Sequence, residues 1–290
     1  MIPVSPPFRI YGQSERASKV HEVIKRAESD MKQSLDAIVI NELVPSDYVD
    51  QITKDLQELG FHYRSNAIQS SIKLNGGIWI FSRVPIEKHY VKPFSNCTDL
   101  DCVITKGVSY VKLKRPHSRD TLHLFGTHLQ AWSKPEHVKV REQQIHEMNQ
   151  FIKDLKIPKK EMLVVMGDLN VEDASDEHKN MLSILKLESP KKHPKSHPHT
   201  MNPAQNSLAG VDSSVYYGCS DTYAAKKKCT CCPKQWLDYA LVKKGSTKKS
   251  SFIKSLPIQV APFPMSYSFW ETGQSEDVSD HYPVWASLSG

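Results

Sequence analysis

The chain has 290 residues, of which 39% are hydrophobic and 24% charged, and Lys plus Arg exceed Asp plus Glu by 38 to 32. This composition excludes collagen-like and low-complexity classes, and no apolar run approaches the roughly 20 residues of a transmembrane helix. No basic and then apolar start follows Met1, so we expect a soluble globular chain without a secretory signal. The net charge of +6 fits phosphate-bearing partners, anionic membranes or an ordinary basic surface.

Helical and strand patterns alternate along the chain, which predicts an α/β fold built as one domain over residues 1–290. Apolar residues at helical spacing predict helices that begin after Ser14 and at Ser46, and a long helix over 138–155. Short apolar runs predict strands at 35–40, 77–81, 108–113, 121–125, 162–166, 237–242 and 283–288. We expect residues 190–203, rich in Lys, His and Pro, to form a long surface loop.

The cysteines fall into two groups, Cys97 with Cys102 and four more over residues 219–232. Two or three disulfides would suit a secreted protein, whereas free thiols would suit a cytosolic one, and the spacing leaves both open. A zinc site at 229–232 is only weakly indicated, because no His cluster follows it.

Four clusters of polar residues adjoin predicted strands, at the strand ends where α/β sheets present their sites. Each cluster alone could be a helix cap or a loop contact, but the four together indicate one site. They are Asn41-Glu42, residues 126–130 around His128, residues 167–170 with Asp168 and Asn170, and residues 279–281 with Asp280 and His281.

The residue types in these clusters suit metal-assisted hydrolysis of a phosphate ester. Carboxylate and amide oxygens are ligands that Mg²⁺ prefers, and no Cys or paired-His motif for catalytic zinc accompanies them. His128 and His281 titrate near neutral pH, which suits proton transfer. Asp238, in Trp-Leu-Asp-Tyr, could orient a His ring by accepting its N–H.

The same motifs carry a resemblance to a known family. Ile-Asn-Glu, Gly-Thr-His-Leu-Gln-Ala, Gly-Asp-Leu-Asn-Val, Leu-Asp-Tyr and Ser-Asp-His-Tyr-Pro-Val match, in order, the endonuclease–exonuclease–phosphatase superfamily. Residues 11–17, Lys106-Gly107 and residues 200–209 resemble its sphingomyelinase C branch, the neutral Mg²⁺-dependent sphingomyelin phosphodiesterases. The resemblance covers residue 11 to the end of the chain. It implies an α/β (α+β) fold, a four-layer α/β/β/α sandwich of two packed mixed sheets flanked by helices.

The resemblance also implies a catalytic role for each matched position. His281 would be the general base that activates water, with Asp238 as its orienting partner. Asp168 and Asn170 would position the water and the phosphate. His128 would stabilise charge on the phosphoryl oxygens or assist the departing alkoxide.

Further positions are implied to bind the metal and the substrate. Glu42 would be the central metal ligand, and Asp280 would support the metal side of the site. Lys106 and Asn206 would contact the substrate. The implied cofactor is Mg²⁺, for which Mn²⁺ or Co²⁺ could substitute.

The resemblance further implies a peripheral contact with a sphingomyelin-containing membrane. The uncharged, aromatic-rich segment 261–270 ends in Phe269 and Trp270, which match a membrane-dipping pair, although both residues could instead belong to the core. We expect a monomer without a stable protein partner, and secretion of a full-length form.

The chain departs from the family pattern in two places. Residues 1–10 contain Pro3, Pro6 and Pro7 and no Asn, so the family's first core strand, which ends in an Asn metal ligand, is expected to be missing. Leu74-Asn75 replaces an acidic pair that serves an accessory metal, so we expect one metal site. Two other functions remain open: a nuclease of the same fold that acts on DNA or RNA, and a truncated, non-catalytic lipid-binding relative.

Overall fold

The computed structural model describes residues 12–44, 46–69, 73–114, 121–210, 233–244, 251–266 and 272–288. The helices are α1 (Gln13–Ala17), α2 (Val20–Met31), α3 (Ser46–Glu58), α4 (Pro135–Asp154), α5 (Asp176–Leu185) and the 3₁₀ helix η1 (Asp99–Val103). The strands are β1 (Ala37–Ile40), β2 (Tyr63–Arg64), β3 (Trp79–Ser82), β4 (Ile86–Pro93), β5 (Gly107–Lys114), β6 (Thr121–His128), β7 (Met162–Asp168), β8 (Leu187–Glu188), β9 (Lys191–Lys192), β10 (Asp238–Lys243), β11 (Phe252–Ser255), β12 (Phe263–Ser266), β13 (Thr272–Ser275) and β14 (Val284–Ser287).

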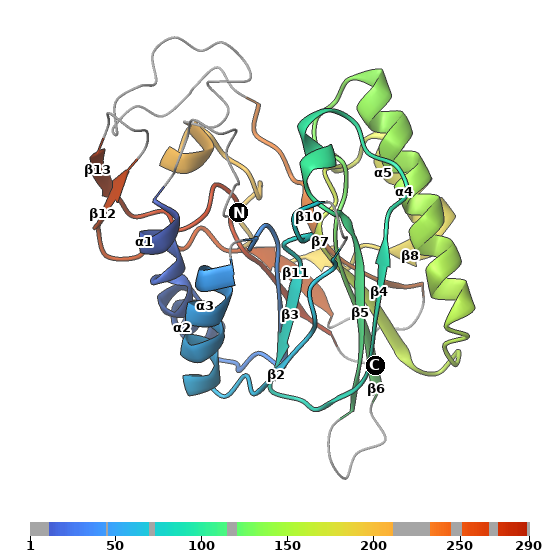
Figure 1. Cartoon of the computed structure of the whole chain (residues 1–290), viewed down its shortest axis with the longest axis horizontal. Helices are drawn as coiled ribbons and strands as arrows, with labels where there is room; N and C mark the ends of the chain where they lie inside the picture. Colours follow the sequence, from blue (N-terminus) through green and yellow to red (C-terminus); the bar gives the residue numbers. More distant parts are fainter. Residues whose placement is uncertain are drawn as a thin grey trace.

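Two layers of β-structure lie between two layers of helices (Figure 1). One layer is a six-stranded sheet in the order β4-β5-β6-β7-β10-β8, and the other consists of two three-stranded sheets, β1-β3-β2 and β14-β11-β9. Helices α4 and α5 cover the six-stranded sheet, and α1 to α3 lie on the opposite side of the molecule. The predicted four-layer sandwich is confirmed.

Neighbouring residues of β6 illustrate how the layers pack. Phe125 packs edge-on against Phe151 of α4, with ring centroids 6.2 Å apart. The next residue, Gly126, points to the other sheet, where an added Cβ would lie only 3.0 Å from Val39 and 3.3 Å from Ile80. A glycine at this position therefore lets the two β-layers approach closely.

The predicted strands all occur, but two other predictions need correction. The helix expected to begin after Ser14 is two helices interrupted at residues 18–19, and Gly12, not Ser14, occupies the first N-cap position. The long loop at 190–203 contains the short strand β9, and its end is buried from Thr200 to Asn202, because residues 200 and 201 bond to the backbone of Gln235. The sequence patterns also missed β4 and α5.

The missed strand β4 is an edge strand whose side chains are mostly exposed, so its sequence lacks apolar alternation. Ser175 is the N-cap of the missed helix α5, and its hydroxyl accepts a hydrogen bond from the His178 backbone amide at 3.0 Å. Cys97 and Cys102 form a disulfide, with their Cα atoms 5.2 Å apart, whereas the other four cysteines lie outside the described residues. In the described part of the chain, every helix is too short or too polar to cross a membrane.

The side chain of Arg83, directly after β3, contacts both the helical layer and the segment that leads into β1. Its guanidinium pairs with the Glu28 carboxylate of α2 and donates hydrogen bonds to the carbonyls of Leu35 and Leu59 at 2.8 to 3.0 Å. It also stacks over the Phe61 ring, 4.2 Å from its centroid. One side chain thus fixes α2, the end of α3 and the entry to β1.

The ion pair between Glu28 and Arg83 makes a contribution to stability that depends on pH. Burial acts to raise the pKa of Glu28, but hydrogen bonds from Arg83 and from the Leu35 amide lower it below the ordinary 4.5. A carboxyl whose pKa is lower in the folded than in the unfolded state stabilises the fold above the unfolded pKa, and this contribution is lost as the pH falls through the folded pKa.

We therefore expect Glu28→Gln to lower the free energy of unfolding by about 1–2 kcal/mol at pH 7, measured by urea denaturation, with a difference that shrinks below pH 4.5. The control is Glu58→Gln, at an exposed position on α3, which should change the free energy by less than about 0.5 kcal/mol. A Glu28→Gln penalty that does not vary with pH would contradict this account.

Candidate active site

The register of three neighbouring strands brings polar residues to one rim of the six-stranded sheet. Strands β6 and β7 are parallel, and their last residues, His128 and Asp168, lie side by side. Strand β10 is antiparallel to β7, and its first residue, Asp238, lies opposite Asp168. The positions of these three residues are therefore fixed by hydrogen bonding between strands and do not depend on loops.

The other β-layer supplies the remaining residues of the same rim. Strand β1 ends at Ile40 and is followed by Glu42, whose φ of 62° turns the chain sharply. Asp280 and His281 lie shortly before β14, where the backbone of His281 forms a bridge with Met201. The site thus spans the two β-layers, as the polar clusters at the strand ends predicted.

His281 is held by carboxylates. Its Nδ1 lies 2.7 Å from Asp238 Oδ2 and 3.9 Å from Asp168 Oδ2, and its side chain is 9% exposed. Burial acts to lower the pKa of His281, but the charges of Asp238, Asp168 and Asp280 and the hydrogen bond with Asp238 raise it to about 10. Asp238 therefore fixes the orientation of the ring and favours its protonated form.

His128 has the opposite electrostatic character. It is 2% exposed, and its pKa lies well below the ordinary 6.5 because of burial and the positive charges of Lys106 and His281. Its Nε2 lies 3.1 Å from Lys106 Nζ, so this nitrogen accepts from the ammonium group. Its Nδ1 then carries the proton and points to Glu42 Oε1, 3.5 Å away.

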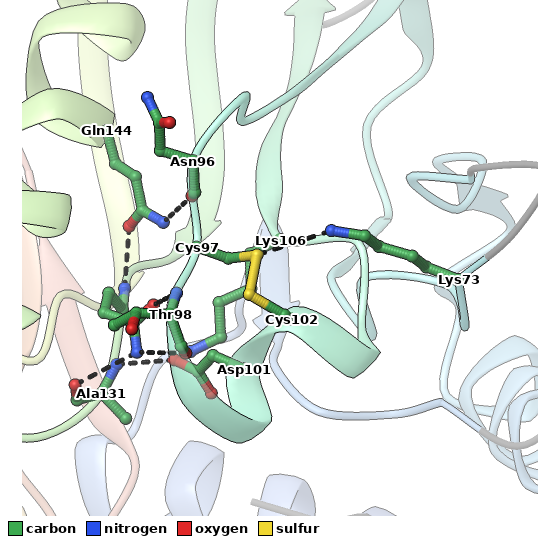
Figure 2. The surroundings of a disulfide bond; sticks show 10 residues. Lys73, Asn96, Cys97, Thr98, Asp101, Cys102, Lys106, Ala131 and Gln144 are labelled. Carbon is green, nitrogen blue, oxygen red and sulfur yellow. Dashed lines mark hydrogen bonds and ion pairs between the residues drawn. A yellow bond between two sulfur atoms is a disulfide. The ribbon is translucent and has the colours of Figure 1, made fainter.

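Lys106 is held by an ion pair with a residue of a loop that a disulfide closes (Figure 2). Its ammonium group donates to Asp101 Oδ2 and to the Leu129 carbonyl, both at 2.7 Å, and Lys106 is 3% exposed. Asp101 belongs to η1, which the Cys97–Cys102 disulfide closes, and the same carboxylate oxygen accepts from the Ala131 amide at 2.7 Å. Sequence reasoning missed Asp101, although two acidic residues between paired cysteines were a visible signal.

The rim holds more carboxyl groups than cations. Glu42, which is 13% exposed, has its pKa raised to about 8 by burial and by the negative charge of Asp280. Burial and the charge of Asp238 raise the pKa of Asp168 to about 7. Both shifts indicate negative charge that the protein itself does not balance.

These groups fit a divalent metal ion. One ligand atom each from Asp168, Asp238 and His281 lies within 4.8 Å of the others. Among the described residues, Asp168 Oδ2 and His128 Nδ1 are buried without a hydrogen-bond partner. The unbalanced carboxylates are the oxygen donors that Mg²⁺ prefers.

The two predicted asparagines lie at different places. The backbone N–H of Asn170 donates to Asp168 Oδ1 at 2.8 Å, and its side-chain amide donates to the Leu129 carbonyl at 3.1 Å. Asn170 thus links the ends of β6 and β7. Asn206 is buried, donates to the Ser279 carbonyl at 2.8 Å and accepts from the amides of residues 208 and 209. It thereby supports the segment that carries Asp280 and His281, and its contact with substrate stays a prediction. Phe269 and Trp270 lie outside the described residues.

Comparisons with known proteins agree with this architecture. Curated relatives are the sphingomyelinase C of Leptospira interrogans, 30% identical over 98% of this chain, and that of Bacillus cereus, 28% identical over 96%. The chain spans 49% of the Leptospira protein and 83% of the Bacillus protein, so it corresponds to about half of the former.

Solved structures share the fold over nearly the whole chain. The crystal structure of SmcL is 26% identical, with a TM-score of 0.75 over 94% of this chain and 92% of that one. Beta toxin from Staphylococcus aureus with bound magnesium ions is 23% identical, with a TM-score of 0.77 over 93% of this chain and 90% of that one, a likeness of fold alone. The model of the endonuclease/exonuclease/phosphatase family matches residues 8–281, and the chain therefore belongs to that family.

Proposed function

We propose that this chain is a Mg²⁺-dependent phosphodiesterase that hydrolyses sphingomyelin to ceramide and phosphocholine. The observation that carries the proposal is the convergence of the His281–Asp238 pair, the His128–Lys106 pair and Glu42 at one rim. The similarity to curated sphingomyelinase C proteins over nearly the whole chain supports this substrate class.

His281 is the general base of the proposed reaction. Asp238 Oδ2 accepts a hydrogen bond from His281 Nδ1–H, 2.7 Å between the two atoms, and thereby leaves Nε2 to take a proton from the attacking water. Asp238 also stabilises the imidazolium that results, because its charge raises the pKa of His281. Asp168, 3.9 Å from the same ring, helps to orient the water.

His128 and Lys106 act on the phosphate. The Lys106 ammonium and the Nδ1 proton of neutral His128 are a cation and a donor at buried positions, where they stabilise negative charge that develops on the phosphoryl oxygens. Asp101 and the Leu129 carbonyl hold Lys106 in one position before substrate arrives, so little reorganisation accompanies the reaction.

Glu42 and Asp280 would hold the metal ion, with Asp168 beside them. Mg²⁺, when bound, supplies positive charge that offsets these carboxylates and the charge that develops on the phosphate and on the departing alkoxide. Asp168 and Asp280 are also among the charges that raise the pKa of His281, so a cation held beside them would favour the neutral form of its ring.

Sphingomyelin lies in a bilayer, so the proposal includes a peripheral membrane contact. The segment that ends in Phe269 and Trp270 is the proposed contact, on the strength of its uncharged aromatic sequence. A monomeric enzyme secreted in its full-length form is part of the same proposal.

The proposed reaction predicts metal-dependent release of phosphocholine. Purified protein with Mg²⁺ should release phosphocholine from sphingomyelin vesicles, and EDTA should abolish release until Mg²⁺, Mn²⁺ or Co²⁺ is added. His281→Gln should lower kcat by about 10²–10⁴-fold, the usual contribution of a general base. The control is His146→Gln, at an exposed position on α4, which should match the original chain.

Two outcomes would decide against the sphingomyelinase. Ready cleavage of DNA or RNA without phosphocholine release would indicate a nuclease of the same fold. Vesicle binding without turnover, unaffected by Mg²⁺ or by His281→Gln, would indicate a non-catalytic lipid-binding relative.

The position of Lys106 predicts a separate effect on the chemical step. Lys106→Met keeps the length of the side chain but removes the charge, and it should lower kcat by about 10²–10³-fold with little change in KM. Lys112→Met removes a half-buried lysine that pairs with Glu87 and lies outside the site, and is the matched control. Equal losses in both variants, or a loss explained by a lower Tm, would contradict the proposed role.

A further inference from the structure

The most exposed large aliphatic side chains of the described residues gather beside the catalytic rim. Leu74, Leu100 and Val103 are 45%, 54% and 52% exposed. Leu100 and Val103 lie three positions apart in η1, and side chains at this spacing in a 3₁₀ helix lie on the same side. The Leu74 amide donates to the Val103 carbonyl at 3.1 Å, so Leu74 lies beside them. We call these three residues the η1 patch.

The fold holds the η1 patch in its exposed position. The Cys97–Cys102 disulfide closes the loop around η1 (Figure 2). Inside this loop, Asp101 Oδ2 accepts hydrogen bonds from Lys106 Nζ and from the Ala131 amide, both at 2.7 Å. A short loop that is closed by a disulfide and bonded to the protein through its one inward carboxylate cannot turn its aliphatic side chains inward. Their exposure is therefore a feature of the fold.

The charged groups near the η1 patch suit a lipid surface. Both carboxylates of η1 are paired within the protein, Asp101 with Lys106 and Asp99 with His137, each at 2.7 Å. The residue that precedes the first leucine of the patch, Lys73, is exposed. A lysine at the margin of an apolar surface keeps its ammonium group at the level of lipid phosphates while its carbon chain contacts the apolar layer.

The size of the η1 patch distinguishes between two kinds of occupant. Three half-exposed aliphatic side chains offer far less area than the roughly 800 Å² per partner that a stable protein–protein interface buries. A peripheral contact with a bilayer needs only apolar side chains that enter the boundary between headgroups and acyl chains, about 5–10 Å deep, and its strength scales with the apolar area buried. A lipid surface therefore fits the patch better than a second copy of the chain or another protein.

The η1 patch is connected directly to the proposed phosphate-binding groups. Asp101, which lies between Leu100 and Val103 in the chain, pairs with Lys106, whose ammonium group lies 3.1 Å from His128 Nε2. An η1 turn seated at the boundary of headgroups and acyl chains therefore brings this cation to the level of the lipid phosphates.

We propose that the η1 patch is a docking surface for a bilayer of phosphocholine lipids, separate from the segment that ends in Phe269 and Trp270. The three aliphatic side chains enter the lipid, and the disulfide-closed turn sets the depth at which Lys106 meets the phosphate. This proposal rests on the proposed function, because it takes the substrate to be a membrane lipid.

The first test replaces the patch by polar residues of similar size, Leu74→Asn, Leu100→Asn and Val103→Thr together. Binding is measured by sedimentation with vesicles of sphingomyelin and phosphatidylcholine, in a His281→Gln background so that the lipid is not consumed. The triple variant should raise the Kd by about tenfold or more, because less apolar area leaves water on binding. The control is Tyr63→Asn, at a 39% exposed position that pairs with the end of β3 away from the rim, and it should leave the Kd unchanged.

The second test separates docking from chemistry, in chains that keep His281. The triple variant should lose about tenfold or more in kcat/KM on the same vesicles, and its turnover of the water-soluble ester 4-nitrophenyl phosphocholine should equal that of the original chain. If the original chain hydrolyses neither substrate, the proposed function fails, whereas the sedimentation measurement still decides on the docking surface.

A tryptophan placed in the patch reports directly on contact with acyl chains. Phosphatidylcholine that carries bromine on its acyl chains should quench the added fluorescence of Leu100→Trp and not that of Tyr63→Trp, each measured against the original chain with its five tryptophans. If the triple variant has a lowered Tm, Leu100→Asn alone takes its place in both earlier tests.

Three results would overturn the proposal. One is an unchanged Kd for vesicles together with absent quenching of Leu100→Trp. Another is an equal loss of turnover on vesicles and on the soluble ester, because the patch would then only support Asp101. The third is self-association of the original chain that the triple variant abolishes in sedimentation velocity, because a second copy would then be the occupant.

Discussion

The concentration of negative charge at one rim of the sandwich is the constraint on which the rest of the site depends. Four carboxyl groups share this rim with two cationic side chains, and burial prevents water from screening them. Burial and neighbouring negative charge together raise the pKa values of Glu42 and Asp168, and the neighbouring carboxylates raise that of His281 against the effect of burial. A further cation would offset this excess of negative charge, which is the electrostatic reason for the proposed Mg²⁺.

Backbone pairing explains how such an unfavourable cluster is held together. His128, Asp168 and Asp238 terminate three paired strands, so they cannot move apart without loss of ladder hydrogen bonds. Lys106 is held differently, by the Asp101 carboxylate on a short helix closed by a disulfide. The rigid sheet therefore positions the residues proposed to handle water, and the disulfide-closed loop positions the positive charge proposed to act on the phosphate.

The sequence predicted the strands and the polar clusters at their ends because apolar runs and the residues that adjoin them are local features. It did not predict β4, an edge strand whose side chains are mostly exposed, or the break between α1 and α2, where helical spacing continues through residues that leave the helix. Asp101 was missed although it lies between the paired cysteines, because its contacts with Lys106 and Ala131 form only in the folded chain. The four carboxyl groups of the rim could be named from the sequence, but the opposite pKa shifts of His128 and His281 depend on burial and distance.

The two halves of the site differ in how firmly the fold supports them. His128 and Asp168 belong to central strands of the six-stranded sheet, whereas Glu42 and His281 adjoin the four-residue strands β1 and β14 of the second β-layer. Short strands open more readily than long central ones. The positions of the proposed general base and metal ligand are therefore more sensitive to local opening of the second β-layer than the positions of the proposed phosphate-binding groups. Stability of the second β-layer and the geometry of water activation are, for this reason, physically linked.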